Sequence, residues 1–430
     1  MIDVEQPNER ALLVGAPPLD RSQELVDEHL AELARLATTA GAAVVGALVQ
    51  RLEAPHPATY IGTGKLEELA RMARERGATL IVFDEDLSPA QGSAIEERIG
   101  VRVMDRTELI LDIFALRART AEAKLQVELA QLQYMRPRLK RMWTHLSRTQ
   151  GGIGARGPGE QQLETDRRLI DRRIARLGGR LEEIARSRDT QRKARRAAYQ
   201  VALVGYTNAG KSSILRSLSG SDLFVEDRLF ATLDSATRAV QLGEGYEALV
   251  TDTVGFIRKL PHHLVASFRA TLEEVGEADL LLHVIDASAP NWEHQAQAVD
   301  EVLADMGADP AGVLLVFHKV DRLGSTRRAA LRERSAAFMG PHVMTTVEEA
   351  EGLEPLRAVL RQRIRARRPT VRLVVPVADG RTLAEAYREG EVLSREQNGT
   401  EIVLVARVPE AVVGRWEGQE GVRVVRQDAA

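Results

Sequence analysis

Short apolar runs alternate with helix-like stretches in the first hundred residues. Apolar runs lie at 11–14 and 80–83, and helical patterns lie at about 22–38, 64–76 and 88–99. Strands separated by helices are typical of βαβ units, which build parallel sheets. The pattern therefore predicts an α/β domain over residues 1–104.

Apolar residues in the next segment follow the period of a helix packed against a second helix. One series comprises Ile170, Ile174, Leu177, Leu181 and Ile184, and Leu125, Leu129, Leu132 and Leu139 suit an antiparallel partner. We therefore expect a helical hairpin over 105–197. Its Gly-rich stretch at 149–159 carries Ile153 and Arg156 at the tip. Because this stretch is longer than a helical hairpin needs, we interpret it as a partner-binding probe, with a plain flexible turn as the alternative.

The rest of the chain has the pattern of two more α/β domains. Apolar runs at 201–204, 248–250 and 312–317 indicate strands of a mostly parallel sheet within 198–368. Runs at 371–377 and 401–408 flank a helical pattern near 381–394, which predicts a small C-terminal α/β domain over 369–430. The expected fold class is a multidomain α/β protein.

A glycine-rich motif, G-Y-T-N-A-G-K-S at 205–212, joins an apolar run to a helical stretch. Glycines let backbone N–H groups converge on phosphates, and the helix offers its positive N-terminal end. We expect Lys211 to reach the β and γ oxygens and Ser212 to place its hydroxyl on Mg²⁺. The predicted phosphate-binding residues are Gly205, Tyr206, Thr207, Asn208, Ala209, Gly210, Lys211, Ser212 and Ser213.

Two downstream motifs suit a site that senses the γ-phosphate. Asp252, Thr253, Val254 and Gly255 follow an apolar run, so Asp252 is expected to hold a Mg²⁺-bound water at a strand end. The N–H of Gly255 is expected to meet the γ-phosphate. Between the motifs, Phe230, Ala231 and Thr232 lie in a polar segment, and we expect Thr232 to close over Mg²⁺. Lys211, Thr232 and Gly255 are the candidate catalytic residues.

The base is predicted from the sequence H-K-V-D at 318–321. The carboxylate of Asp321 can accept from guanine N1–H and N2–H₂, donors that adenine lacks there, so GTP is favoured over ATP. The alternative that the chain is a metabolic P-loop kinase is disfavoured by the same carboxylate. The usual pattern is N-K-x-D, so Lys319 matches it while His318 departs from it, and we expect this departure to weaken guanine affinity or selectivity. Thr346 and Val347 align, poorly, with the last base-recognition element.

The expected rate of hydrolysis depends on two further positions. Phe256 follows Gly255 where many regulatory GTPases place a water-orienting glutamine, so intrinsic hydrolysis should be slow. Asn208 lies at the position where some related GTPases have an asparagine that binds K⁺. The alternative, that Asn208 simply tolerates a tight loop conformation, is equally open. His262 and His263 are expected to pack or contact a partner rather than to act as bases.

Composition excludes several classes of protein. The sequence has no apolar run of about eighteen residues and no basic start followed by a hydrophobic stretch, so we expect no membrane span, no secretion and a cytoplasmic location. The absence of cysteine excludes disulfides, thiolate catalysis and Cys-ligated zinc. We expect a monomer.

The net charge of −3 hides a basic middle segment. From Tyr134 to Arg196 there are 18 Lys or Arg and 7 Asp or Glu, an excess of +11, so the remaining residues carry −14. Such a patch is typical of nucleic-acid binding, because neutralised phosphates release counterions. A solvated helical face is the competing interpretation.

Several motifs together resemble the HflX GTPases, of the Obg-HflX group in the translation-factor class. They are the sequences at 205–212, F-A-T-L-D at 230–234, D-T-V-G-F-I at 252–257, L-P-H-H-L-V at 260–265 and R-G-P-G-E-Q-Q-L-E at 156–164. The stretch at 60–65 and a helix expected from Leu109 to Leu139 are also similar. The resemblance implies a GTPase that binds the large ribosomal subunit and its rRNA, near the peptidyl-transferase centre. It also implies separation of the subunits of stalled or hibernating ribosomes under stress.

Two other interpretations accompany this one. An RNA-binding or RNA-remodelling module whose G domain regulates affinity would share the same motifs. Gly62, Thr63, Gly64 and Lys65 superficially resemble a second phosphate loop, but Leu66 occupies the metal-ligand position. We therefore favour a simple turn into a helix there.

Overall fold

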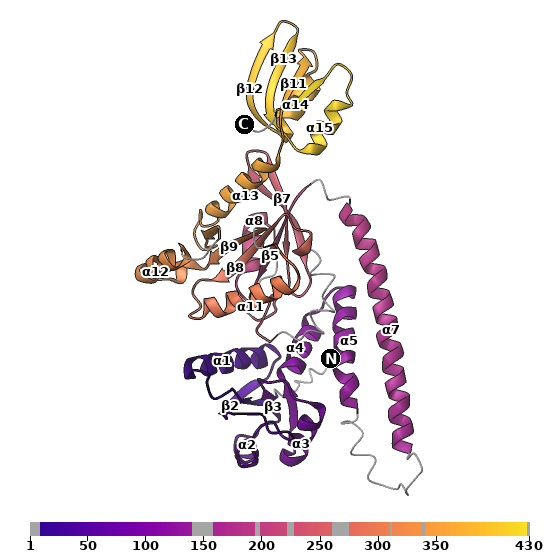
Figure 1. Cartoon of the computed structure of the whole chain (residues 1–430), viewed down its shortest axis with the longest axis vertical. Coiled ribbons are helices and arrows are strands. Elements are labelled where there is room, and N and C mark those ends of the chain that lie inside the picture. Colours follow the sequence, from indigo (N-terminus) through magenta and orange to yellow (C-terminus); the bar gives the residue numbers. More distant parts are fainter. Residues whose placement is uncertain are drawn as a thin grey trace, which may run out of the picture. The chain divides into compact units, whose positions relative to one another are not determined.

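The computed structural model describes residues 9–139, 158–193, 198–221, 228–259, 275–309, 312–336 and 340–427. Contacts divide the chain into two compact units. The first unit is Met1–Ala185, Glu226–Asp234 and Lys259–Ala270, and the second is Arg186–Val225, Ser235–Arg258 and Thr271–Ala430. Three separate sheets with their helices confirm the multidomain α/β class (Figure 1). The boundaries of the four predicted domains stay predictions.

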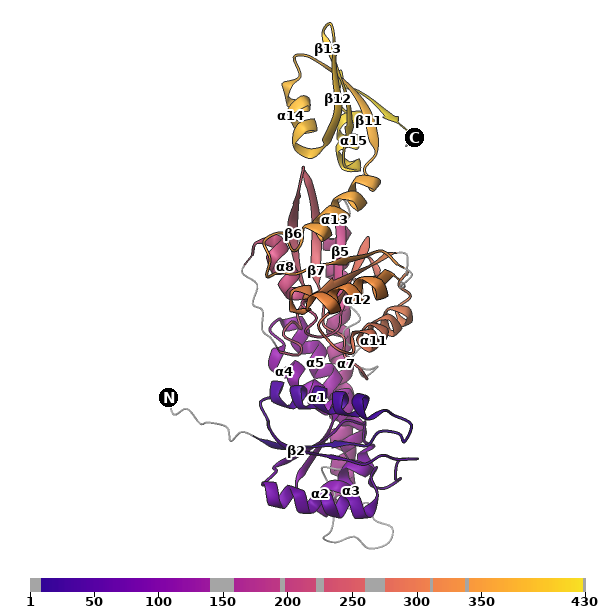
Figure 2. The same cartoon turned by 90° about the vertical axis from the view of Figure 1, so that its left-hand side faces the viewer.

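The first unit contains a four-stranded parallel sheet in the order β2-β1-β3-β4. Its strands are β1 (Arg10–Gly15), β2 (Ala43–Val49), β3 (Leu80–Phe83) and β4 (Arg102–Asp105), and its helices are α1 (Gln23–Thr39), α2 (Thr63–Arg76), α3 (Pro89–Ile99) and α4 (Arg106–Arg117). Figure 2 shows α2 and α3 on one face and α1 on the other. The three predicted helices are confirmed within one residue. The edge strands β2 and β4 were not predicted.

The helical pair follows as α5 (Ala121–Met135), a short 3₁₀ turn η1 (Arg136–Arg138) and α7 (Pro158–Lys193). The single helix expected from Leu109 to Leu139 is wrong, because α4 ends at Arg117 and Thr120 starts α5. The Thr120 side chain accepts from the amide of Ala123, and such an N-cap requires an extended backbone. Leu177 of α7 is buried, and Arg173 of α7 pairs with Glu128 of α5 at 2.6 Å. The predicted helical pairing is confirmed.

The second unit begins with a six-stranded sheet in the order β10-β9-β8-β5-β7-β6. The strands are β5 (Tyr199–Gly205), β6 (Ala236–Gly243), β7 (Tyr246–Asp252), β8 (Leu280–Asp286), β9 (Val313–His318) and β10 (His342–Met344), and only the β6–β7 pair is antiparallel. The helices are α8 (Lys211–Ser219), α11 (Trp292–Asp305), α12 (Ser325–Ala336) and α13 (Glu354–Arg367), with a 3₁₀ turn η3 (Val320–Arg322). The mostly parallel sheet confirms the predicted GTPase-type fold.

The C-terminal residues form an antiparallel sheet in the order β12-β13-β11-β14, with the βαββαβ arrangement of ferredoxin-like folds. The elements are β11 (Thr370–Pro376), α14 (Gly380–Glu389), β12 (Glu391–Asn398), β13 (Glu401–Arg407), α15 (Glu410–Glu417) and β14 (Arg423–Gln427). The helix expected near 381–394 ends at Glu389, so its last residues belong to β12. A Cβ atom at Gly390 would lie 2.4 Å from Val408 Cγ1, and this close packing favours glycine at the turn.

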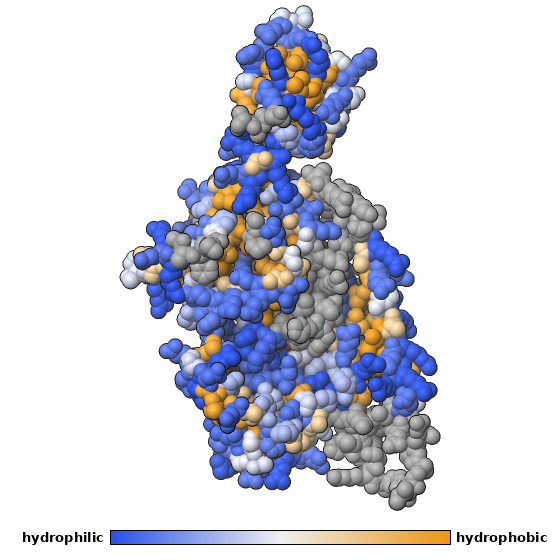
Figure 3. All heavy atoms as spheres, in the orientation of Figure 1, coloured by the Kyte–Doolittle hydropathy of each residue, from blue (hydrophilic) through white to orange (hydrophobic). Residues whose placement is uncertain are grey.

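The surface is largely hydrophilic, with apolar residues visible along the α5 and α7 region (Figure 3). Among the residues that the structure describes, no helix is long and apolar enough to cross a membrane.

Candidate nucleotide-binding site

Glycines fix the path of the loop between β5 and α8. Gly205 has φ of 147°, and a Cβ atom there would lie 2.2 Å from the carbonyl oxygen of Val284. Gly210 has φ of 107°, and a Cβ there would lie 2.3 Å from the His318 ring. Each position combines a positive φ with no room for a Cβ atom, and only glycine meets both conditions. Asn208 has φ of 63°, so it adopts the tight loop conformation that asparagine tolerates.

Lys211 points back along this loop. Its Nζ atom donates to the carbonyl oxygens of Gly205 and Tyr206, both at 3.0 Å. The residue is only 6% exposed, and burial lowers the pKa of its ammonium to about 8, against the opposing effect of Asp252. Nearby Lys319 lowers this pKa further. A phosphate placed here would meet a cation that has little solvent to compete with it.

Two residues predicted to serve Mg²⁺, Ser212 directly and Asp252 through a bound water, lie together. The Ser212 hydroxyl donates to Asp252 Oδ2 at 2.6 Å, because Ser212 lies in the first turn of α8 and Asp252 ends β7, next to β5 in the sheet. A hydroxyl and a carboxylate fit Mg²⁺, which takes few protein oxygens and completes its shell with water and phosphate. The described residues contain no cluster of three or more acidic, His or Cys ligands, so these two would hold the ion with the nucleotide.

Gly255 lies against the phosphate loop. The amide of Thr207 donates to the Phe256 carbonyl at 2.6 Å, and the Phe256 amide donates to the Gly205 carbonyl at 3.1 Å. A Cβ atom at Gly255 would lie 2.6 Å from Thr207 Cα and 3.1 Å from Lys211 Nζ. The structure thus places Gly255 next to Lys211, and the contact of its N–H with the γ-phosphate stays a prediction.

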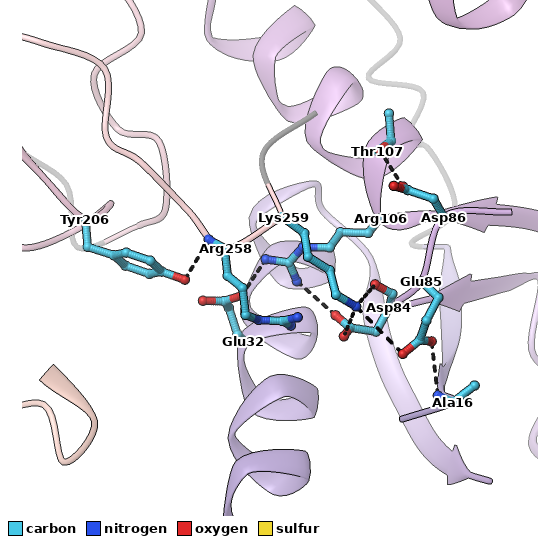
Figure 4. Close-up of polar contacts among 10 residues, drawn as sticks. All are labelled: Ala16, Glu32, Asp84, Glu85, Asp86, Arg106, Thr107, Tyr206, Arg258 and Lys259. Atoms are coloured by element: carbon cyan, nitrogen blue, oxygen red, sulfur yellow. Dashed lines mark hydrogen bonds and ion pairs between the residues drawn. The ribbon is translucent and has the colours of Figure 1, made fainter. Parts of the chain in front are cut away.

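Neighbouring residues of these motifs hold the strands in place. The Thr253 hydroxyl donates to the Leu203 carbonyl at 2.7 Å, and Val254 is buried. Ala209 is also buried, and the Tyr206 hydroxyl accepts from the amide of Arg258 at 3.0 Å (Figure 4). Ser213 lies half-buried in α8.

The base-recognition residues meet at the ends of β9 and β10. The Thr346 hydroxyl donates to Asp321 Oδ1 at 2.5 Å. Lys319 Nζ donates to the Asn208 carbonyl at 2.8 Å and to Asp286 Oδ2 at 2.7 Å. Val347 packs against the apolar core of the six-stranded sheet. The structure therefore brings Asp321 and Thr346 together, whereas the side chain of Val347 serves packing.

Asp286 was missed by the sequence analysis. Burial raises the pKa of its carboxyl, but Lys319 and two hydrogen bonds from Ser288 together outweigh burial and hold that pKa below its usual range. The carboxylate thereby anchors the lysine that also binds the phosphate loop. Its position at the end of β8 was the available signal, because the carboxyl ends of parallel strands gather at one edge.

His318 is almost fully buried, at 1% exposure, between the phosphate loop and a second residue that the sequence did not reveal, Thr345. Its Nδ1 lies 3.1 Å from the Thr345 hydroxyl oxygen. Burial, with a smaller effect of Lys319, lowers the pKa of the imidazole to about 4. The ring is therefore neutral near pH 7.

The segment with Thr232 belongs to the first unit. Phe230 is buried there, and Ala231 and Thr232 are half-buried. The placement of Thr232 on Mg²⁺ stays a prediction.

Other candidates lie elsewhere. His262, His263, Ile153 and Arg156 are outside the described residues, as is most of 149–159. Gly62 precedes α2, and Lys65 pairs with Glu68 at 2.9 Å, so this stretch is a turn into a helix.

Comparisons with known proteins cover most of the chain. A family described as GTP-binding GTPase N-terminal matches residues 27–115, a GTP-binding GTPase middle region matches 117–195, and a 50S ribosome-binding GTPase family matches 200–319. Among solved structures, a GTP-binding protein from Sulfolobus solfataricus in complex with GDP is 24% identical with a TM-score of 0.44, over 83% of this chain and 98% of that one.

Two curated relatives are similar over nearly their whole length. The GTPase HflX of Magnetococcus marinus is 44% identical over 430 residues, which is 99% of either chain. The GTPase HflX of Escherichia coli K12 is 41% identical over 413 residues, which is 95% of this chain and 96% of its own. Because identity of this size spans both proteins almost end to end, the chain belongs to the HflX family of GTPases.

Proposed function

We propose that this GTPase binds the large ribosomal subunit in its GTP-bound form and separates the subunits of stalled or hibernating ribosomes under stress. It acts in the cytoplasm as a monomer. The description of the matching family, a 50S ribosome-binding GTPase, supports the ribosomal partner. The separation of subunits and the stress role rest on the resemblance of the motifs to this family.

The observation that carries the ribosomal partner is a row of cations on α7. Arg172, Arg176 and Arg180 recur every four residues, so they lie along one face of the helix. All three are exposed, and they form no ion pair with any residue that the structure describes. By contrast, Arg168 and Arg173 on the same helix pair with Glu164 and Glu128. Unpaired guanidinium groups in a row suit the phosphates of RNA.

The nucleotide site explains why the GTPase would need its partner. Lys211 and the amide of Gly255 would bind the γ-phosphate, and Ser212 directly and Asp252 through a water would hold Mg²⁺, whose charge would offset that of the phosphate oxygens. Phe256 is buried and has no group that can orient water. The intrinsic rate is therefore slow, and the ribosome accelerates it. Asn208 has the loop position for a K⁺ ligand, whose charge would serve the same oxygens.

Pelleting with isolated large subunits tests this partner. We expect the protein with a non-hydrolysable GTP analogue to co-sediment, and a variant with Arg172, Arg176 and Arg180 changed to Gln to bind far more weakly. For this variant, the slope of log affinity against log salt concentration should also be shallower, by roughly 0.7–0.9 for each lost phosphate contact.

A variant with Arg35, Arg327 and Arg332 changed to Gln is the matched control, because it loses the same charge from exposed positions on other helices. Equal weakening in both variants would show a general charge effect and contradict the role of the row. Tight binding to any structured RNA, without preference for large subunits, would favour the alternative of an RNA-remodelling module.

A further inference from the structure

Residues 228–234, which carry Thr232, are anchored within the first unit on both sides of that threonine. On one side, the Phe230 ring packs edge-on against Phe114 of α4, with 4.7 Å between ring centroids. Both rings are almost fully buried. On the other side, Asp234 Oδ2 accepts from the amides of Arg119 and Thr120, at 3.0 Å and 3.3 Å. Asp234 Oδ1 accepts from the Thr120 hydroxyl.

The second anchor lies at the start of α5, the first helix of the helical pair. Amides at a helix N-terminus lack partners within the helix, and a carboxylate is favoured there by the helix dipole. Thr120 completes the cap by accepting from the amide of Ala123 at 3.1 Å. The Asp234 carboxylate thus accepts hydrogen bonds that the amides at the start of α5 would otherwise donate to water.

The short piece of chain between Thr232 and Asp234 links this cap to the predicted nucleotide contact. Two residues span at most about 7 Å, so Asp234 cannot stay in place if Thr232 moves far. Strand β6 begins at Ala236, only two residues after Asp234, and pairs with β7, which ends at Asp252. A short piece of chain therefore connects the cap of α5 to the Mg²⁺ residues.

The segment after Gly255 has a similar anchor. Lys259 Nζ donates to the Asp84 carbonyl at 3.2 Å and to Asp84 Oδ2 at 3.3 Å, and it lies 3.8 Å from Glu85 Oε1. Figure 4 shows these carboxylates beyond β3, where Arg106 also pairs with Asp84 and Glu32. Both phosphate-sensing segments thus end on the first unit.

We propose that Asp234 is a positioning residue that couples the γ-phosphate to the helical pair. When Thr232 closes on GTP and Mg²⁺, Asp234 is held on α5 and its capped turn is stabilised. By linkage, a partner that holds the helical pair favours GTP over GDP to the same extent. The coupling belongs to the isolated protein and rests on the predicted contact of Thr232 with Mg²⁺, while the identity of that partner rests on the proposed function.

Hydrogen exchange on the isolated full-length protein tests the coupling. We expect the amides of Arg119 and Thr120 to exchange several-fold more slowly with a non-hydrolysable GTP analogue than with GDP. In Asp234→Ala this nucleotide dependence should disappear, and the preference for the GTP analogue over GDP should fall about fivefold, the lower end of usual allosteric couplings. Equal exchange with both nucleotides in the unaltered protein would overturn the proposal.

Three further variants separate coupling from loss of stability. Thr120→Ala should behave as Asp234→Ala does, and Thr120→Ser, which keeps the hydroxyl, should restore the nucleotide dependence. Ser88→Ala removes the cap of α3 in the same unit without touching residues 228–234, and it should leave the dependence unchanged. Persistence of the dependence in Asp234→Ala would also overturn the proposal, while large-subunit binding would remain a separate question.

Discussion

The Nδ1 atom of His318 lies 3.1 Å from the hydroxyl oxygen of Thr345. The histidine that replaces the usual asparagine is thus held inside the fold beside the phosphate loop. An imidazole offers one donor or acceptor at each nitrogen, whereas an amide offers both kinds of group at one end. We predict that His318→Asn binds GDP and GTP more tightly by about 1 kcal/mol, roughly fivefold, without changing ATP binding. Calorimetric titrations measure this, and unchanged guanine affinity would show that the imidazole is an adequate replacement.

The same burial predicts a dependence of stability on pH. The pKa of His318 is about 4 in the folded protein, below its ordinary value of 6.5. The unfolded chain therefore binds the extra proton first, and the free energy of unfolding falls as pH drops from about 6.5 to 4. The loss is at most on the order of 3 kcal/mol. Urea unfolding at pH 7 and pH 5 should show a smaller difference for His318→Asn than for the unaltered protein, and equal differences would refute this assignment.

Asp321 gives a test of base recognition. The Thr346 hydroxyl donates to Asp321 Oδ1, and the carbonyl oxygen of an asparagine can accept the same bond, which leaves its amide facing the base. We predict that Asp321→Asn loses guanine affinity and gains xanthine affinity, because the C2 oxygen of xanthine can accept from that amide. Competition between GDP and XDP measures the change. An unaltered guanine preference would remove Asp321 from the specificity site.

Lys211 predicts the pH dependence of nucleotide binding. Its pKa of about 8 should rise when phosphate oxygens replace the carbonyls of Gly205 and Tyr206 as partners. Binding then takes up a proton above pH 8, so GTP affinity should fall by up to about tenfold per pH unit there. Fluorescence titrations from pH 7 to pH 9.5 measure the slope. Lys211→Ala should lose hydrolysis at every pH, and turnover in that variant would mean that the active site is elsewhere.

Local motifs were the predictable part of this site. Gly205, Lys211 and Ser212 follow from one strand-to-helix turn, whose backbone demands glycine at fixed places, and the structure places them accordingly. Asp286 and Thr345 were missed because their roles depend on which strands neighbour β5 and β9. That order is decided by the packing of the whole sheet, and residues far apart in the chain carry it.

The errors in the predicted secondary structure have similar causes. The break between α4 and α5 is made by Thr120, whose capping role competes with a helix whose apolar pattern continues on both sides. The helix near 381–394 was extended too far because it ends before Gly390, where Val408 leaves no room for a Cβ atom, and no local pattern reveals that distant neighbour. The edge strand β2 has the sequence AVVGALV, which lacks the alternation of a half-buried strand, and only Leu48 in it is buried.

The Gly-rich stretch at 149–159 lies mostly outside the described residues, and its role as a probe remains a prediction. We expect that replacing 151–159 with a short Gly-Ser turn spares intrinsic GTP hydrolysis and removes both ribosome stimulation and subunit separation. Hydrolysis assays without and with ribosomes measure the intrinsic rate and the ribosome-stimulated rate. Full stimulation of the shortened protein would reduce this stretch to a linker.

The separation of subunits is the central claim, and sucrose-gradient sedimentation of intact ribosomes tests it most directly. Ribosomes are mixed with the protein and a non-hydrolysable GTP analogue, with GDP as the matched control. We predict that free subunits appear with the analogue, that the protein travels with the large subunit, and that ribosomes with GDP stay intact. Intact ribosomes that carry the bound protein in the presence of the analogue would contradict the account.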